Sequence, residues 1–149
     1  MPTAAPAPTT APAPTVAAAR PRATTAPVAP FSAAEAGPAD TSGDPAAGAA
    51  LFASLPSEAV AVGGVNCSVC HNIAPGSGTL VGPSLSGIGA IAATRQPDLS
   101  AAQYLRVSII NPSAYVVDGF AAGVMPGVYP KGLTPEQIED LVAYLLTLP

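Results

Sequence analysis

The chain has 149 residues, of which 49% are hydrophobic and 9% are charged, and its formal net charge is −4. All nine aspartate and glutamate residues lie from Glu35 onward, where the three cations Arg95, Arg106 and Lys131 leave a net charge of −6. An acidic domain of this kind argues against nucleic acid as a partner and against a docking face ringed by lysine side chains.

The first 36 residues differ in composition from the rest of the chain. Nine of the nineteen prolines fall within the first 38 residues, among alanine and threonine. We therefore predict a low-complexity tail or tether over residues 1–36 and one folded domain over residues 37–149. Residues 1–19 are uncharged, but their prolines interrupt any continuous helix, so we expect no transmembrane span. They also lack the basic start and leucine-rich centre of a signal peptide.

The first helix is predicted over residues 45–52. Asp44 is a good N-cap, and Pro45 suits the first helical position. Gly48 weakens such a helix, so either another helix or an aromatic ring packs closely there, or the glycine is merely tolerated. Residues 58–66 are predicted to be a connection without chemistry of its own.

The reactive side chains of the sequence gather in one short stretch. Its only two cysteines, Cys67 and Cys70, are followed directly by its only histidine, His71. Two cysteines with this spacing can reach both vinyl groups of one haem as thioethers, and the next imidazole then falls under the iron. A structural zinc site would lack a fourth ligand, a thioredoxin-like dithiol would need a preceding strand, and a chance match is possible for so short a pattern.

Residues 72–89 form a glycine-punctuated loop in this interpretation. Within it, the carbonyl of Pro83 is a candidate acceptor for the outer N–H of His71, which would fix the orientation of the imidazole. The alternative is that Gly82 and Pro83 form an ordinary turn.

Two further helices are predicted toward the C-terminus. Asp98 or Ser100 caps a helix over residues 101–110, which ends before Pro112. A capping box of Thr134 and Gln137 starts the last helix. The apolar residues of this helix recur at helical spacing and form a stripe along one face, which core packing alone explains.

Met125 lies between these two helices and is the only methionine besides Met1. A lone methionine is usually a flexible core filler. A haem iron bound by His71 would lack a sixth ligand, however, and the sequence has no second histidine. We therefore predict that Met125 is that ligand.

These residues, in this order, resemble the class I monohaem c-type cytochromes, and the resemblance covers about residues 44–149. Its matching segments are residues 48–52, 67–71, 82–87, 125–126 and 141–145. The resemblance implies a small all-α fold whose first and last helices cross around one covalently bound haem c, with Gly48 near Tyr144. It also implies thioethers at Cys67 and Cys70, axial ligands at His71 and Met125, and Pro83 as the partner of His71.

Residues 110–120, followed by residues 124–126, look more particularly like cytochrome c domains of membrane respiratory complexes. Examples are domains fused to oxidase subunits and the monohaem subunit of alternative complex III. This resemblance implies an electron-transfer protein and not an enzyme, on the periplasmic side of a membrane. It would have a redox donor and acceptor, and subunits contacted by the tail. The alternatives are a freely diffusing or tethered carrier, and a haem enzyme or gas sensor with an open sixth site.

Overall fold

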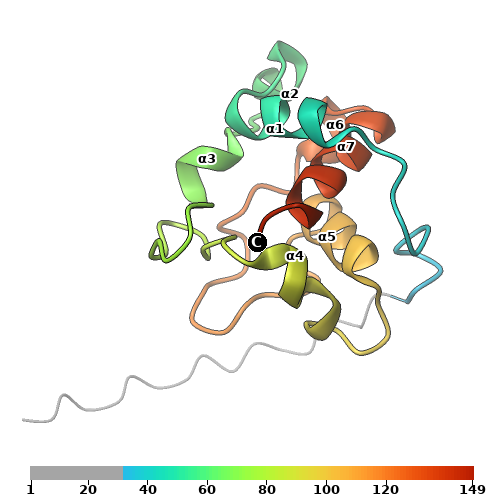
Figure 1. Cartoon of the computed structure of the whole chain (residues 1–149). Coiled ribbons are helices and arrows are strands. Elements are labelled where there is room, and N and C mark those ends of the chain that lie inside the picture. The colour runs from blue at the N-terminus through green and yellow to red at the C-terminus, as the bar shows by residue number, and fades with distance from the viewer. Residues whose placement is uncertain (1–31) are drawn as a thin grey trace, which may run out of the picture.

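The computed structural model of the protein describes residues 32–149, so most of the predicted tail lies outside the described residues. The helices, in chain order, are α1 (Pro45–Ala53), α2 (Ser57–Ala61), α3 (Cys67–Cys70), α4 (Ile88–Ile91), the 3₁₀ helix η1 (Ala92–Thr94), α5 (Ala101–Ile110), α6 (Tyr129–Gly132) and α7 (Pro135–Leu146) (Figure 1). No strand occurs in this part of the chain, which confirms the predicted all-α fold.

The longer helices begin where their capping residues predict. Asp44 accepts a hydrogen bond from the backbone N–H of Ala46 at 2.8 Å and so caps α1. Ser100 caps α5 through a complete capping box with Gln103. Thr134 and Gln137 form the same box at the start of α7. Each box satisfies two backbone donors that the first turn of a helix leaves without partners.

The first and last helices pack against each other through Gly48. A Cβ atom at this position would overlap the carbonyl of Asp140 and lie 2.7 Å from Cβ of Tyr144. The neighbouring rings of Phe52 and Tyr144 lie 5.6 Å apart with a tilted geometry. Of the two alternatives that the sequence left open at Gly48, the close approach is therefore the one observed, and glycine brings the two helix backbones together.

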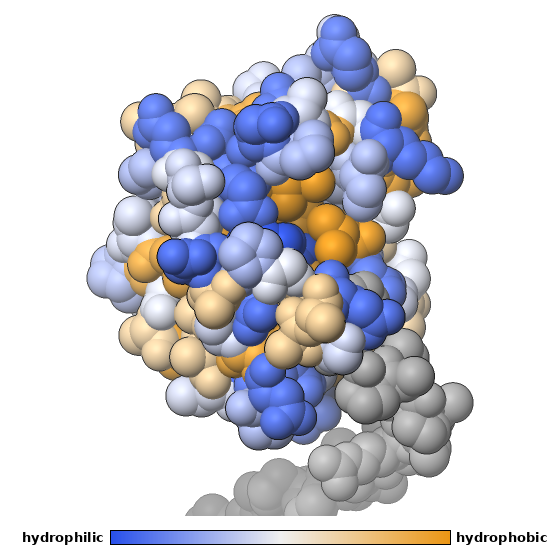
Figure 2. Space-filling view, turned by 90° about the vertical axis from the view of Figure 1, so that its right-hand side faces the viewer, coloured by the Kyte–Doolittle hydropathy of each residue, from blue (hydrophilic) through white to orange (hydrophobic). Residues whose placement is uncertain are grey.

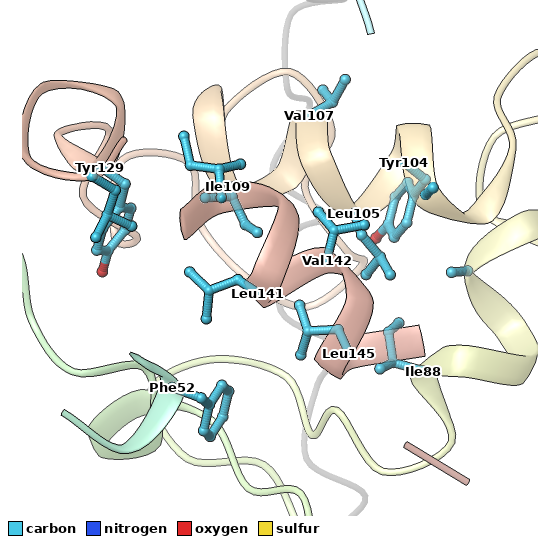
Figure 3. Packing of buried hydrophobic residues seen from close by; sticks show 14 of the residues in the cluster. Phe52, Ile88, Tyr104, Leu105, Val107, Ile109, Tyr129, Leu141, Val142 and Leu145 are labelled. Atoms are coloured by element: carbon cyan, nitrogen blue, oxygen red, sulfur yellow. The ribbon is translucent and has the colours of Figure 1, made fainter. Parts of the chain in front are cut away.

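Helix α7 forms the centre of the core (Figure 3). Its Val142 faces Leu105 of α5 and is completely buried, whereas Leu141 points to the side on which Phe52 and Tyr129 lie. Phe52 of α1 lies on the other side of α7 from α5 in this view. The apolar stripe predicted for the last helix is thus the surface on which both neighbouring helices pack.

Five short helical elements were not predicted, namely α2, α3, α4, η1 and α6. Helix α4 begins at Ile88, so the loop predicted over residues 72–89 ends two residues early. Residues 58–66 were expected to be a connection, but their first part belongs to α2, and α6 was not anticipated at all. Neither helix has a side-chain N-cap. They hold each other by close packing, because a Cβ atom at Gly132 of α6 would overlap Cα of the buried Ala59 of α2.

Residues 32–44 run along one side of the domain and pack against α5 and α7 (Figure 1, right-hand side). Ala36 in this segment is completely buried. Figure 2 looks at that side and shows hydrophilic and hydrophobic side chains interspersed over it. The domain boundary at residue 37 stays a prediction. None of the helices within residues 32–149 is long and apolar enough to cross a membrane.

Candidate functional site

A large apolar cavity opens beside the core, between α3, α5, α7 and the loops that join them. It encloses about 1240 Å³, open space at its mouth included. Its inner wall is made of core side chains, among them Leu105 of α5 and Leu141 of α7, while Val81 and Val124 border its mouth and are half-exposed. Its lining is predominantly apolar, which suits a flat apolar group such as a haem.

The structure brings all five predicted site residues to this one cavity. Cys67, Cys70, His71, Pro83 and Met125 all contribute to its wall. Met125 comes from the long segment between α5 and α6 and is half-buried against the core. Residues that are up to 58 positions apart in the sequence thus line one cavity.

The single turn of α3 positions the cysteines. Cys67 and Cys70 are its first and last residues, so they share one face of the helix. The backbone N–H of His71 donates to the carbonyl of Cys67 at 2.9 Å, which ends the turn directly beneath the imidazole. Two thiols and a ring nitrogen therefore point to the cavity from five consecutive residues.

The imidazole of His71 is held by the loop opposite α3. Its Nδ1 lies 2.8 Å from the carbonyl oxygen of Pro83. Because a carbonyl can only accept, Nδ1 must carry the hydrogen, and Nε2 keeps its lone pair. The N–H of Gly82 donates to the carbonyl of Cys70 at 2.9 Å, which ties the loop to α3.

Aromatic residues surround the cavity. Five of the seven phenylalanines and tyrosines contribute to its wall: Phe52, Tyr104, Tyr115, Phe120 and Tyr129. The rings of Tyr104 and Tyr115 meet edge to face, with centroids 5.6 Å apart. No role in the site was predicted from the sequence for any of these five rings. The one signal in the sequence is that the chain has only seven phenylalanine and tyrosine residues, so a cluster of five of them indicates a shared site.

Tyr129 is fixed at the edge of this site. Its hydroxyl donates to the carbonyl of Val65 at 3.0 Å. Burial raises its pKa to about 12, so the hydroxyl stays protonated over the whole physiological range. Tyr129 can therefore act as a permanent donor that joins α6 to the residues before α3.

The alternative chemistries of the cysteines find little support in this geometry. Burial raises the pKa of the Cys67 thiol to about 11, whereas a reactive dithiol needs a lowered pKa. Within residues 32–149, no group of three or more histidine, cysteine, aspartate or glutamate side chains converges as zinc ligands would.

The donor set, in contrast, fits a covalently bound haem. Two thiols lie one helical turn apart, the neutral form of the adjacent imidazole has its Nε2 lone pair available, and a soft thioether lines the same cavity. A family model described as cytochrome c matches residues 45–149. A comparison with curated protein sequences finds no match. The chain belongs to the cytochrome c family and is a haem electron-transfer protein with covalently attached haem c.

Proposed function

We propose that the chain is the single-haem electron-transfer subunit of a membrane-bound respiratory or photosynthetic complex, on the extracytoplasmic side. One observation carries the electron-transfer part of this proposal. His71 is held by Pro83 at 2.8 Å in a cavity whose wall also contains Met125, so both axial ligands of an iron are available from the protein. A site with both axial positions filled has no place for a substrate.

Each site residue has a role in this proposal. Cys67 and Cys70 form the two thioether bonds, and their spacing on α3 suits the two vinyl groups of one haem. His71 binds the iron through Nε2, and Met125 binds it through its sulfur. The Pro83 carbonyl keeps His71 in one tautomer and one orientation, so its ring does not turn when the charge of the iron changes.

The protein environment tunes the redox chemistry. A bound haem supplies a one-electron couple between ferric and ferrous iron. The thioether of Met125 is a soft ligand that favours the ferrous state, and the apolar wall excludes water, so both features raise the reduction potential. The chain is therefore suited to take electrons from a donor of lower potential and pass them to an oxidase or a soluble carrier.

The membrane complex is supported by features of the sequence. Residues 110–120 and 124–126 resemble domains built into respiratory complexes, and the acidic chain lacks a lysine-rich docking face. In the proposal, residues of the predicted tail contact neighbouring subunits; residues 1–31 lie outside the described residues. A soluble or tethered carrier is the competing function.

The absorption spectrum of the purified protein tests the ligand assignment. We expect sharp c-type bands on reduction and the weak far-red methionine–iron band in the oxidised form. Met125→Ala should abolish the far-red band, lower the reduction potential and let the reduced protein bind carbon monoxide, because the sixth position is then open. Val60→Ala, an exposed position of α2 outside the cavity lining, should change none of these.

Two results would overturn parts of the proposal. Carbon monoxide binding by the reduced wild-type protein at neutral pH would identify an open-site enzyme or sensor. Release of the protein from its native membranes by a salt wash alone would identify a peripheral carrier. A built-in subunit should require detergent and should copurify with other redox subunits at a fixed ratio.

A further inference from the structure

Residues 32–43, which we call the strap, lie on α5 and α7 although they precede the segment that matches the cytochrome c family. The strap is held mainly through its backbone. Three side chains at the start and along one face of α5, those of Ser100, Gln103 and Arg106, donate hydrogen bonds of 2.5 to 3.1 Å to strap carbonyls. The accepting carbonyls belong to Ala33, Ala36, Gly37, Pro38, Ala39 and Asp40.

Arg106 is the centre of this contact. Its side chain is 8% exposed, and all five N–H groups of its guanidinium have acceptors. Two of these bonds go to the carboxylate of Glu139 on α7, and the other three go to the strap. The strap supplies three of the five acceptors, so the guanidinium is nearly buried without leaving any donor unpaired.

Glu139 completes the site from α7. The hydrogen bond from Arg106 lowers the pKa of its carboxyl group, against the opposing effect of burial. The same carboxylate accepts a hydrogen bond from the hydroxyl of Thr41 in the strap at 2.9 Å. A Cβ atom at Gly43 would overlap the carbonyl of Glu139, so the strap backbone lies directly on α7.

The strap binds the side of α5 and α7 that faces away from the cavity. Gln103 and Arg106 are three residues apart and share one face of α5. Leu105 and Ile109, which line the cavity, lie on the other side of the same helix. Figure 1 shows the strap and α3 on opposite sides of the domain.

We propose that this α5–α7 face is a binding site for the chain's own strap. Docking of the strap fixes the point at which the upstream chain leaves the domain, on the side opposite the cavity mouth. Any partner or tether attached through residues 1–31 then leaves the mouth free for a redox protein. Only one part of this inference rests on the proposed electron-transfer function, namely that a redox protein approaches the cavity mouth.

The variant Gln103→Glu tests the strap site. It keeps the Oε1 acceptor that caps α5 but loses the two hydrogen bonds from Nε2 to the strap, and its new charge faces strap carbonyls. Gln137→Glu makes the same change at the same position of the other capping box, without a strap contact. In native-state digestion with a broad-specificity protease, we expect Gln103→Glu to speed cleavage within residues 32–43 by about ten- to a hundredfold, and Gln137→Glu to have no effect.

The exit point is tested separately by fluorescence. A fluorophore is attached to the thiol of the variant Ser32→Cys, where the haem quenches it. We expect a single fluorescence lifetime in the otherwise unchanged chain and a broad distribution of lifetimes when Gln103→Glu is added. The inference would be overturned if the strap were cleaved at the same rate in the unaltered protein, in Gln103→Glu and in Gln137→Glu. A broad distribution of fluorescence lifetimes in the chain without Gln103→Glu would also overturn it. The cleavage result does not depend on haem, whereas failure of the proposed function would appear in the absorption spectrum.

Discussion

The absence of a side chain at Gly82 lets the loop approach the imidazole of His71. A Cβ atom there would lie 2.8 Å from Nδ1 and 3.0 Å from Nε2 of His71 and would overlap Cε1. This ring belongs to the one histidine in the sequence and also meets the Pro83 carbonyl. Any change at Gly82 therefore acts directly on the orientation of the proposed iron ligand.

We expect Gly82→Ala to displace the His71 ring. The added methyl group has no space, so the variant should lower the free energy of unfolding by about 1–3 kcal/mol and shift the reduction potential. Gly78→Ala is the matched control, because a Cβ atom at Gly78 meets nothing within 4 Å. Spectroelectrochemical titration and denaturant unfolding of both variants measure the two effects. An unchanged potential in Gly82→Ala would mean that the ring does not need this contact.

Among single residues, the sequence predicted the roles of those whose chemistry depends on their spacing from close neighbours in the chain. The stretch from Cys67 to His71 could be interpreted because its chemistry depends on consecutive residues. The roles of Gln103 and Arg106 in holding the strap were not predicted, because their strap partners are backbone carbonyls 66 to 70 positions away, which every residue type carries. The ligand roles of His71 and Met125 stay predictions.

At the scale of elements, the α1–α7 contact depends on one glycine inside a helix. Helical propensity favours alanine over glycine by about 1 kcal/mol, whereas the space at Gly48 is already filled by the Asp140 carbonyl and Tyr144. The two effects have opposite signs. Packing should win, since the obstacle is partly backbone and cannot move aside.

Gly48→Ala should therefore destabilise the protein by about 1–3 kcal/mol despite the better propensity of alanine. The reverse change at an exposed position of the same helix, Ala50→Gly, should cost about 1 kcal/mol through propensity alone. Denaturant unfolding of the haem-bearing protein measures both values. If Gly48→Ala were stabilising, the close crossing of α1 and α7 would be contradicted.

The sequence predicted those helices that have explicit start signals. Asp44, Ser100 and Thr134 cap α1, α5 and α7, and each capping side chain makes its hydrogen bond. Helices α2 and α6 have no side-chain cap and only 5 and 4 residues, so their stability comes from packing on each other. Such tertiary stabilisation has no local pattern in the sequence.

For the whole molecule, the distribution of charge matters more than its sum. No aspartate, glutamate, lysine or arginine occurs in residues 59–94, which include α3 and the loop that carries Val81. The segment that carries Val124 at the other side of the mouth, residues 112–126, contains only Asp118. Leu80 and Val69 add half-exposed apolar surface to the first of these segments. The cavity mouth is thus nearly uncharged within an acidic molecule.

We expect electron exchange through this mouth to depend weakly on salt. The rate constant for oxidation by an anionic or a cationic metal complex should change by less than about twofold between ionic strengths of about 0.01 and 0.15 M, because Asp118 is the only charged side chain in the two segments that border the mouth. Stopped-flow measurements with ferricyanide and a cationic cobalt complex test this. Leu80→Lys should make both rates salt-dependent, while Val60→Lys on α2 should not. Rates that follow the net charge of −4 in the unaltered chain would contradict the prediction.

The strap also has a consequence for the order in which the chain folds. Its hydrogen bonds to Ser100, Gln103 and Arg106 span 61 to 70 residues, and the bond from Thr41 to Glu139 spans 98. Its acceptors can be bound only after α5 and α7 exist, since α7 supplies the carboxylate that orients Arg106. The segment that a ribosome makes before the rest of the domain therefore cannot form these bonds until almost the entire domain has been synthesised.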